Sequence, residues 1–85
     1  MKVNKKMVAL VLLHEFGVAK PSVYKELNGV HRSSYRSKPG NGIEYHAFYF
    51  EADAKSFLDI YIQSEFVKRY EFVKKDGKVS LQLMS

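Results

Sequence analysis

The stretch GVAKPSVYKELNG, residues 17–29, decides between two folds for the N-terminal third of the chain. Pro21 suits the first position of a helix, because its missing amide N–H would be unpaired there in any case. Val23 and Leu27 are four residues apart and would lie on the same face of a helix. The glycine that closes the stretch would end the helix in the left-handed conformation. The pattern therefore favours a short helix over residues 21–28.

A β-hairpin is the alternative for the same residues, because the Asn-Gly pair at 28–29 is a strong two-residue turn signal. Residues 22–27 and 30–37 would then be paired strands. With a two-residue turn, Lys25 would stand opposite Arg32, and two like charges facing each other across a hairpin are destabilising. For that reason we prefer the helix.

A longer helix is predicted before this stretch, over residues 4–16. Asn4 can cap it, because its side chain can accept a hydrogen bond from an amide of the first turn. Apolar residues cover most of its circumference, so the helix must be nearly enclosed. Gly17 is placed to end it. A buried strand is the competing interpretation of the apolar run at 7–13.

Two further elements follow. Residues 30–51 are predicted to form a hairpin, because the proline- and glycine-rich segment 38–42 is typical of a turn. Residues 52–65 are predicted to form a third helix, with Asp53 in the first turn, where the helix dipole favours an acid. Its buried stripe would consist of Ala54, Phe57, Leu58, Tyr61 and Ile62.

The chain ends in a second predicted hairpin, residues 66–85, which turns on Asp76-Gly77. A two-residue turn at that place sets Phe72 opposite Leu81 and Tyr70 opposite Leu83. One face of the hairpin is then apolar and the other is charged or polar, as expected for a sheet that packs on one side.

The positive charge of the protein is concentrated in its N-terminal half. The net charge is +5; residues 1–42 hold eight Lys or Arg against two acids, and residues 43–85 hold six against seven. A one-sided basic balance favours polyanionic partners.

The order helix, tight turn, short helix, glycine-tipped hairpin, helix resembles the winged helix-turn-helix DNA-binding domains of the excisionase, AlpA-like and MerR-like kind. The resemblance covers residues 7–62. It is carried by GVAKPSVYKELNG at 17–29 and by NGIEYHAFYFEADAKSFL at 41–58. The chain departs from the family pattern at Leu13, where a small residue is usual, and in the shortness of the second helix.

The resemblance implies a small α+β winged helix-turn-helix fold in one domain over residues 1–85. Its parts would be the helix-turn-helix at 1–29, the wing at 30–51, a helix at 52–65 and the hairpin at 66–85. The alternative fold is an α+β domain with a four- or five-stranded antiparallel sheet and two helices.

In function, the resemblance implies a phage- or plasmid-type regulator or an excisionase-like architectural factor that binds double-stranded DNA. The helix at 21–28 would enter the major groove, and the hairpin at 30–50 would contact the backbone. A homodimer or a protein partner would use the C-terminal hairpin. The DNA-binding residues implied are Lys20, Ser22, Tyr24 and Lys25 in the helix region and Arg32, Arg36, Lys38 and Asn41 in the wing.

Two other functions fit the same sequence. The first is a small protein-binding module, such as a phage-type inhibitor of a host protein, in which the basic, tyrosine-rich hairpin meets an acidic surface. The second is an RNA-binding protein that stacks bases on exposed aromatic rings.

The sequence holds little catalytic chemistry. There is no cysteine, and His14, His31 and His46 are not at metal-ligand spacing. The glycines of the 38–42 segment do not precede a helix, so they form no phosphate-binding loop. We therefore expect no enzyme activity, no metal or cofactor, no small-molecule substrate and no membrane partner. The absence of cysteine suits a cytoplasmic protein.

Overall fold

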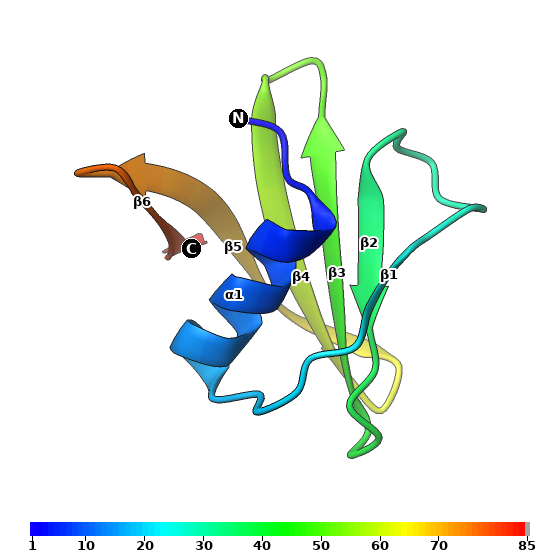
Figure 1. Cartoon of the computed structure of the whole chain (residues 1–85). Coiled ribbons are helices and arrows are strands. Elements are labelled where there is room, and N and C mark those ends of the chain that lie inside the picture. Colours follow the sequence, from blue (N-terminus) through cyan, green and yellow to red (C-terminus); the bar gives the residue numbers. More distant parts are fainter. Residues whose placement is uncertain (85) are drawn as a thin grey trace.

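Six strands, paired in chain order, form one antiparallel sheet with a helix on one face in the computed structural model, which describes residues 1–84 (Figure 1). The helix α1 precedes the sheet, and each strand pairs with its neighbours in sequence. The elements are α1 (Lys5–Phe16), β1 (Val23–Lys25), β2 (Ser34–Ser37), β3 (Ile43–Phe50), β4 (Lys55–Ile62), β5 (Glu65–Lys75) and β6 (Lys78–Met84).

Helix α1 has the caps that its sequence predicts. The Asn4 side chain accepts a hydrogen bond from the amide of Met7 at 2.9 Å. Gly17 follows the helix with φ 67°, in the left-handed region. The amides of Gly17 and Val18 bond to the carbonyls of Leu13 and Leu12, both at 3.1 Å. The predicted helix is confirmed, and the strand alternative for this run is wrong. The helix is not nearly enclosed, however, because Leu10 and Leu13 are 45% and 39% exposed.

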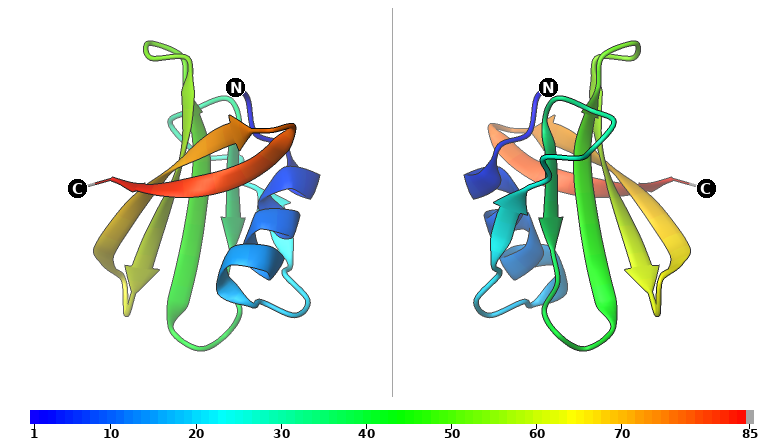
Figure 2. Two further views of the ribbon diagram at one scale, coloured as in Figure 1. Left: turned by 90° about the vertical axis from the view of Figure 1, so that its left-hand side faces the viewer. Right: turned by 90° about the vertical axis from the view of Figure 1, so that its right-hand side faces the viewer.

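The sheet curls around α1, so that the helix contacts both edge strands, β1 and β6 (Figure 2). Alternation along each strand divides the sheet into an inner face, which packs on α1, and an outer face on the opposite side. The core lies between α1 and the inner face. It includes Val8, Val11 and Leu12 of the helix and Val23, Tyr45, Ala47, Leu58, Ile60 and Phe72 of the strands.

The predicted helix at 21–28 is wrong, because this segment contains β1. Val23 is buried and pairs with Ser37, and Lys25 pairs with Tyr35. The loop between β1 and β2 spans residues 26–33 rather than two residues, which shifts the register. Lys25 therefore does not face another cation, and the like-charge argument against a hairpin does not apply.

The predicted helix at 52–65 is also wrong, because it is replaced by a turn and strand β4. Residues 56–60 are buried without interruption, with Leu58 and Ile60 on the inner face and Phe57 and Asp59 on the outer face. A strand buried on both faces loses its polar alternation and reads as an apolar run. The helical spacing of apolar residues in the sequence therefore arises from this uninterrupted apolar strand.

The winged helix-turn-helix fold is therefore wrong: the part of the chain that the structure describes has one helix and six strands. The alternative fold, with two helices and four or five strands, also differs from the structure in the numbers of helices and strands. The two predicted hairpins are confirmed, although the first begins at Ser34 rather than at residue 30 and residue 85 of the second lies outside the described residues. The second turns at Asp76-Gly77 and pairs Phe72 with Leu81 and Tyr70 with Leu83.

Candidate functional site

The outer face of the sheet is lined with aromatic side chains and carries no second layer of secondary structure within residues 1–84. Only the 26–33 loop folds over one part of it. The His31 ring stacks on Phe48 with centroids 4.6 Å apart and meets Phe50 edge-on at 5.6 Å. The strands contribute His46 and Phe48 from β3, Phe57, Asp59 and Tyr61 from β4, and Phe66 and Arg69 from β5.

Arg69 lies at the centre of this face and is held by Asp59. The two residues stand opposite each other in the β4–β5 pairing. Arg69 donates from Nε and Nη2 to the two carboxylate oxygens of Asp59, at 2.7 and 2.8 Å. This hydrogen bonding raises the pKa of the Arg69 guanidinium. The Asp59 side chain is 5% exposed, whereas that of Arg69 is 43% exposed. The buried carboxylate therefore holds the guanidinium in place, and part of the arginine side chain remains in contact with solvent.

Three phenylalanine rings surround the same guanidinium. Its central carbon lies 5.4 Å from the ring centroids of Phe48 and Phe57 and 6.0 Å from that of Phe66. These distances are within the range of cation–π attraction. The bidentate carboxylate and the rings together leave the Arg69 side chain little freedom to change rotamer.

Three hollows border Arg69, with volumes of about 340, 350 and 760 Å³. The first is bordered on one side by the 26–33 loop, and the lining of the second includes Phe48, Phe50 and Phe57. The third is lined by Phe66, Val67 and Met84, all exposed. Arg69 therefore stands between hollows of mixed lining, of which the one bordered by Phe66, Val67 and Met84 is the most apolar.

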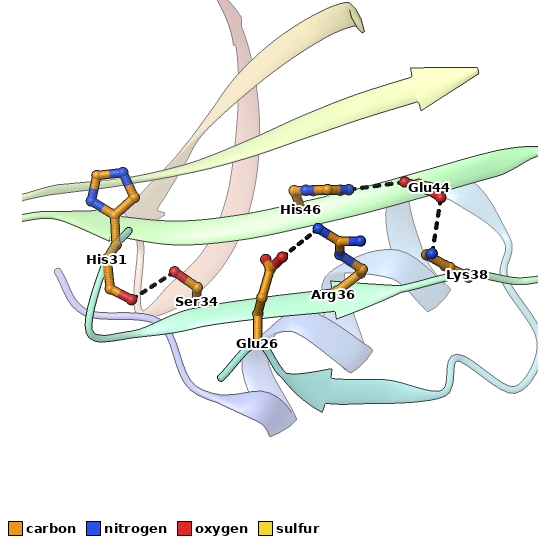
Figure 3. Close-up of polar contacts among 7 residues, drawn as sticks. All are labelled: Glu26, His31, Ser34, Arg36, Lys38, Glu44 and His46. Carbon is orange, nitrogen blue, oxygen red and sulfur yellow. Dashed lines mark hydrogen bonds and ion pairs between the residues drawn. The ribbon is translucent and has the colours of Figure 1, made fainter. Parts of the chain in front are cut away.

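A row of polar contacts continues the outer face across β2 and β3 (Figure 3). Arg36 is paired with Glu26. Glu44 accepts from Lys38 at 3.2 Å and lies 3.1 Å from the Nε2 atom of His46. The hydrogen bonds from His46 and Lys38 lower the pKa of Glu44. Two of the basic side chains predicted to contact DNA are thus engaged by acids of the same chain.

The predicted DNA-binding residues do not form one surface. Lys38 and Asn41 lie at the β2–β3 turn, at the end of the sheet opposite the 26–33 loop, which follows Lys25 and contains Arg32 (Figure 1). Asn41 is occupied locally, because its side chain accepts from the amide of Ile43 at 3.1 Å. The remaining members are Lys20 and Ser22, exposed in the connection after α1, Tyr24, exposed on β1, and Arg36, in its ion pair.

The Arg69 cluster was not predicted from the sequence. The one available signal is Asp59, an acid in the middle of an apolar run between Phe57 and Tyr61. A carboxylate in a buried strand requires a charged or hydrogen-bonding partner. The sequence does not say that the partner is ten residues further on.

The described residues contain neither a cluster that could bind a metal ion nor a helix that could span a membrane. No group of three His, Asp or Glu among them could hold a metal ion. No helix in that part of the chain is long and apolar enough to cross a membrane.

Comparison of the chain with protein-family models, curated proteins and solved structures finds no match. The assignment of a function therefore depends on the surfaces of this molecule.

Proposed function

We propose that the protein is a small protein-binding module that uses the outer face centred on Arg69. The observation that carries this proposal is the Arg69–Asp59 pair, set among three phenylalanine rings and bordered by three hollows. Arginine and aromatic residues are enriched at the centres of protein interfaces, where they fill pockets of the partner or receive its side chains.

The fixed position of Arg69 supports binding because it lowers the entropic cost of association. A free arginine side chain loses rotamer freedom when it becomes part of an interface, whereas one already held loses little. Its guanidinium has five N–H donors, of which two bond to Asp59. The exposed part of the group is therefore suited to a carboxylate or carbonyl oxygen on the partner.

Exposed apolar side chains extend the surface beyond the cluster. Leu27 and Val30, on the loop that folds over this face, are 88% and 95% exposed. Phe66 on β5 is 54% exposed. Isolated apolar residues at a surface are common, but Val30 and Phe66 also border hollows of this face, where they can contact a partner.

A protein partner is favoured over duplex DNA. The segment predicted to form the helix in the major groove contains strand β1 instead. Arg36 and Lys38 are already paired with acids. The proposal keeps the protein partner considered from the sequence but moves the contact from the basic hairpin to the outer face of β3, β4 and β5.

The test is a pull-down of protein partners with the wild type and with two variants that carry the same kind of substitution on opposite faces of the molecule. Phe66→Asp alters the outer face, and Leu10→Asp alters α1, where Leu10 is 45% exposed. The partner should be retained by the wild type and by Leu10→Asp and lost by Phe66→Asp. Circular dichroism and thermal unfolding check that both variants are folded.

Two results would overturn the proposal. One is equal recovery of every partner by Phe66→Asp and Leu10→Asp. The other is recovery that disappears after nuclease treatment and weakens log-linearly with salt, which is the signature of nucleic acid. A photo-crosslinking residue at position 66 identifies the side chain of the partner that meets this face.

A further inference from the structure

A second hollow lies on the other side of the 26–33 loop from the Arg69 cluster, and its wall is basic. Its volume is about 480 Å³. His31 borders both this hollow and two of the hollows around Arg69, so the loop lies between the two sites. The hollow is lined by Lys2, Lys25, Val30, His31, Arg32, Ser33, Tyr49 and Glu51.

The three cations of this wall are free to bind a ligand. Lys2, Lys25 and Arg32 form no ion pair within the described residues, in contrast to Arg36 and Lys38. The Lys2 ammonium lies 5.4 Å from the centroid of the Tyr49 ring. Clustered like charges raise the local potential, and an anion placed among them relieves their repulsion.

The charge and donors of the wall suit a phosphate monoester. Three cations against Glu51, with His31 neutral, give a net charge of +2. A phosphate monoester carries a charge of roughly −1.5 to −2 at neutral pH, whereas a carboxylate or a phosphodiester carries only one. Arg32 supplies a planar pair of donors, and the hydroxyls of Ser33 and Tyr49 supply further ones.

We propose that this hollow is a binding site for a phosphate monoester group, with Lys2, Lys25 and Arg32 as its cations. The hollow is larger than a phosphate group and has an aromatic wall, Tyr49, so the esterified part of the ligand also has room. A phosphorylated side chain and a nucleoside monophosphate share this chemistry. The site shares Val30 and His31 of the loop with the proposed protein-binding face, but it can be tested without a protein partner.

The first experiment is titration of the ¹⁵N-labelled protein with inorganic phosphate near pH 7.5 at constant ionic strength. Saturable shifts are expected at the backbone amides of residues 25, 31–33 and 49. Arg32→Ala and Lys25→Ala should each weaken binding by roughly tenfold or more, because hydrogen bonds to charged groups are lost. The control Lys74→Ala/Lys75→Ala changes exposed lysines at the far end of β5 and should bind as the wild type does.

The source of the phosphate is resolved by two further titrations, one with phosphoserine and one with a nucleoside 5′-monophosphate. Tighter binding of either than of inorganic phosphate identifies its class. The proposal fails if chloride at the same ionic strength reproduces the shifts, if the shifts do not saturate, or if the control variant weakens binding as much as Arg32→Ala. None of these outcomes bears on the Arg69 face.

Discussion

At the scale of single residues, the pair of Asp59 and Arg69 combines a structural and a functional role. Asp59 is almost completely buried, and its carboxylate depends on Arg69 for two hydrogen bonds. A buried charge without a partner is strongly unfavourable, whereas removal of both charges can be nearly neutral. Substitution of Arg69 alone should therefore lower the stability of the protein, and the pair keeps a cation on the outer face.

A double-mutant cycle tests this dependence. Arg69→Met should lower the free energy of unfolding by about 2 kcal/mol, less than for a fully buried pair because Arg69 is partly solvated. Asp59→Asn combined with Arg69→Met should recover part of that loss, because the uncompensated charge is gone. Urea unfolding of the four proteins measures the coupling. Additive effects of the two substitutions would contradict the interpretation.

Glu44 gives a residue-scale prediction for pH. Its pKa is lowered in the folded protein by hydrogen bonds from His46 and then Lys38. The unfolded state therefore binds a proton more readily, and the stability contributed by ionised Glu44 is present above its ordinary pKa of 4.5 and is lost as pH falls through the folded-state pKa.

The variant Glu44→Gln isolates this contribution from those of the other acids. Its free energy of unfolding should be lower than that of the wild type at neutral pH. The difference should shrink as pH falls below 4.5, where Glu44 becomes protonated in both states. Urea unfolding at a series of pH values measures it. A difference that is constant with pH would show that Glu44 does not act through its charge.

At the scale of elements, local signals predicted those parts of the fold that are fixed locally. Asn4 and Gly17 bound α1, and Asp76-Gly77 sets the turn and register of the β5–β6 hairpin. The failures are β1 and β4. A three-residue strand has too few residues to show an alternation, and its pairing depends on β2 across an eight-residue loop.

Strand β4 was missed because its turns also lack the usual residues. Gln63 and Ser64 connect it to β5 with φ values of 52° and 67°, and Ala54 before it has φ 52°. Two successive residues at positive φ form the turn that hairpins favour, but glycine or asparagine normally occupies it. Without that signal, and with an apolar run on both faces, the sequence reads as a helix.

The β4–β5 turn yields a stability prediction. Ser64→Gly should raise the free energy of unfolding by roughly 0.5–1 kcal/mol, because glycine adopts positive φ without steric strain. The same change at exposed Ser22, which is not at positive φ, should give no gain and a small loss through the more flexible unfolded chain. Thermal unfolding compares the two. A loss of stability in Ser64→Gly would show that the serine side chain has a role of its own.

At the scale of the whole molecule, the candidate sites form only because each strand of the sheet pairs with its neighbours in sequence. Phe48, Phe57 and Arg69 lie on three different strands and become neighbours only through the β3–β4–β5 pairings. The sequence predicted β3 but not β4, so it could not place these residues together. It did predict an excess of positive charge in the N-terminal half, and Lys2, Lys25 and Arg32 of the basic hollow belong to that half.

The distribution of charge predicts how the molecule behaves toward duplex DNA. Each phosphate neutralised by a cation contributes about −0.9 to the slope of log K against log salt concentration. Arg36 and Lys38 are paired with acids, and the remaining predicted contacts lie at opposite ends of the sheet. The unpaired cations gathered at one place are Lys2, Lys25 and Arg32 of the basic hollow, so the slope for a random duplex should be no steeper than roughly −3.

Fluorescence anisotropy of labelled duplex DNA over a salt series measures that slope. Lys25→Ala/Arg36→Ala should weaken this residual binding about as much as Lys74→Ala/Lys75→Ala, because in a non-specific encounter each loss of two cations counts alike. A steep slope that falls only in the first double variant would restore DNA as the partner. It would also require the outer-face residues around Arg36 to leave their ion pairs when the duplex binds.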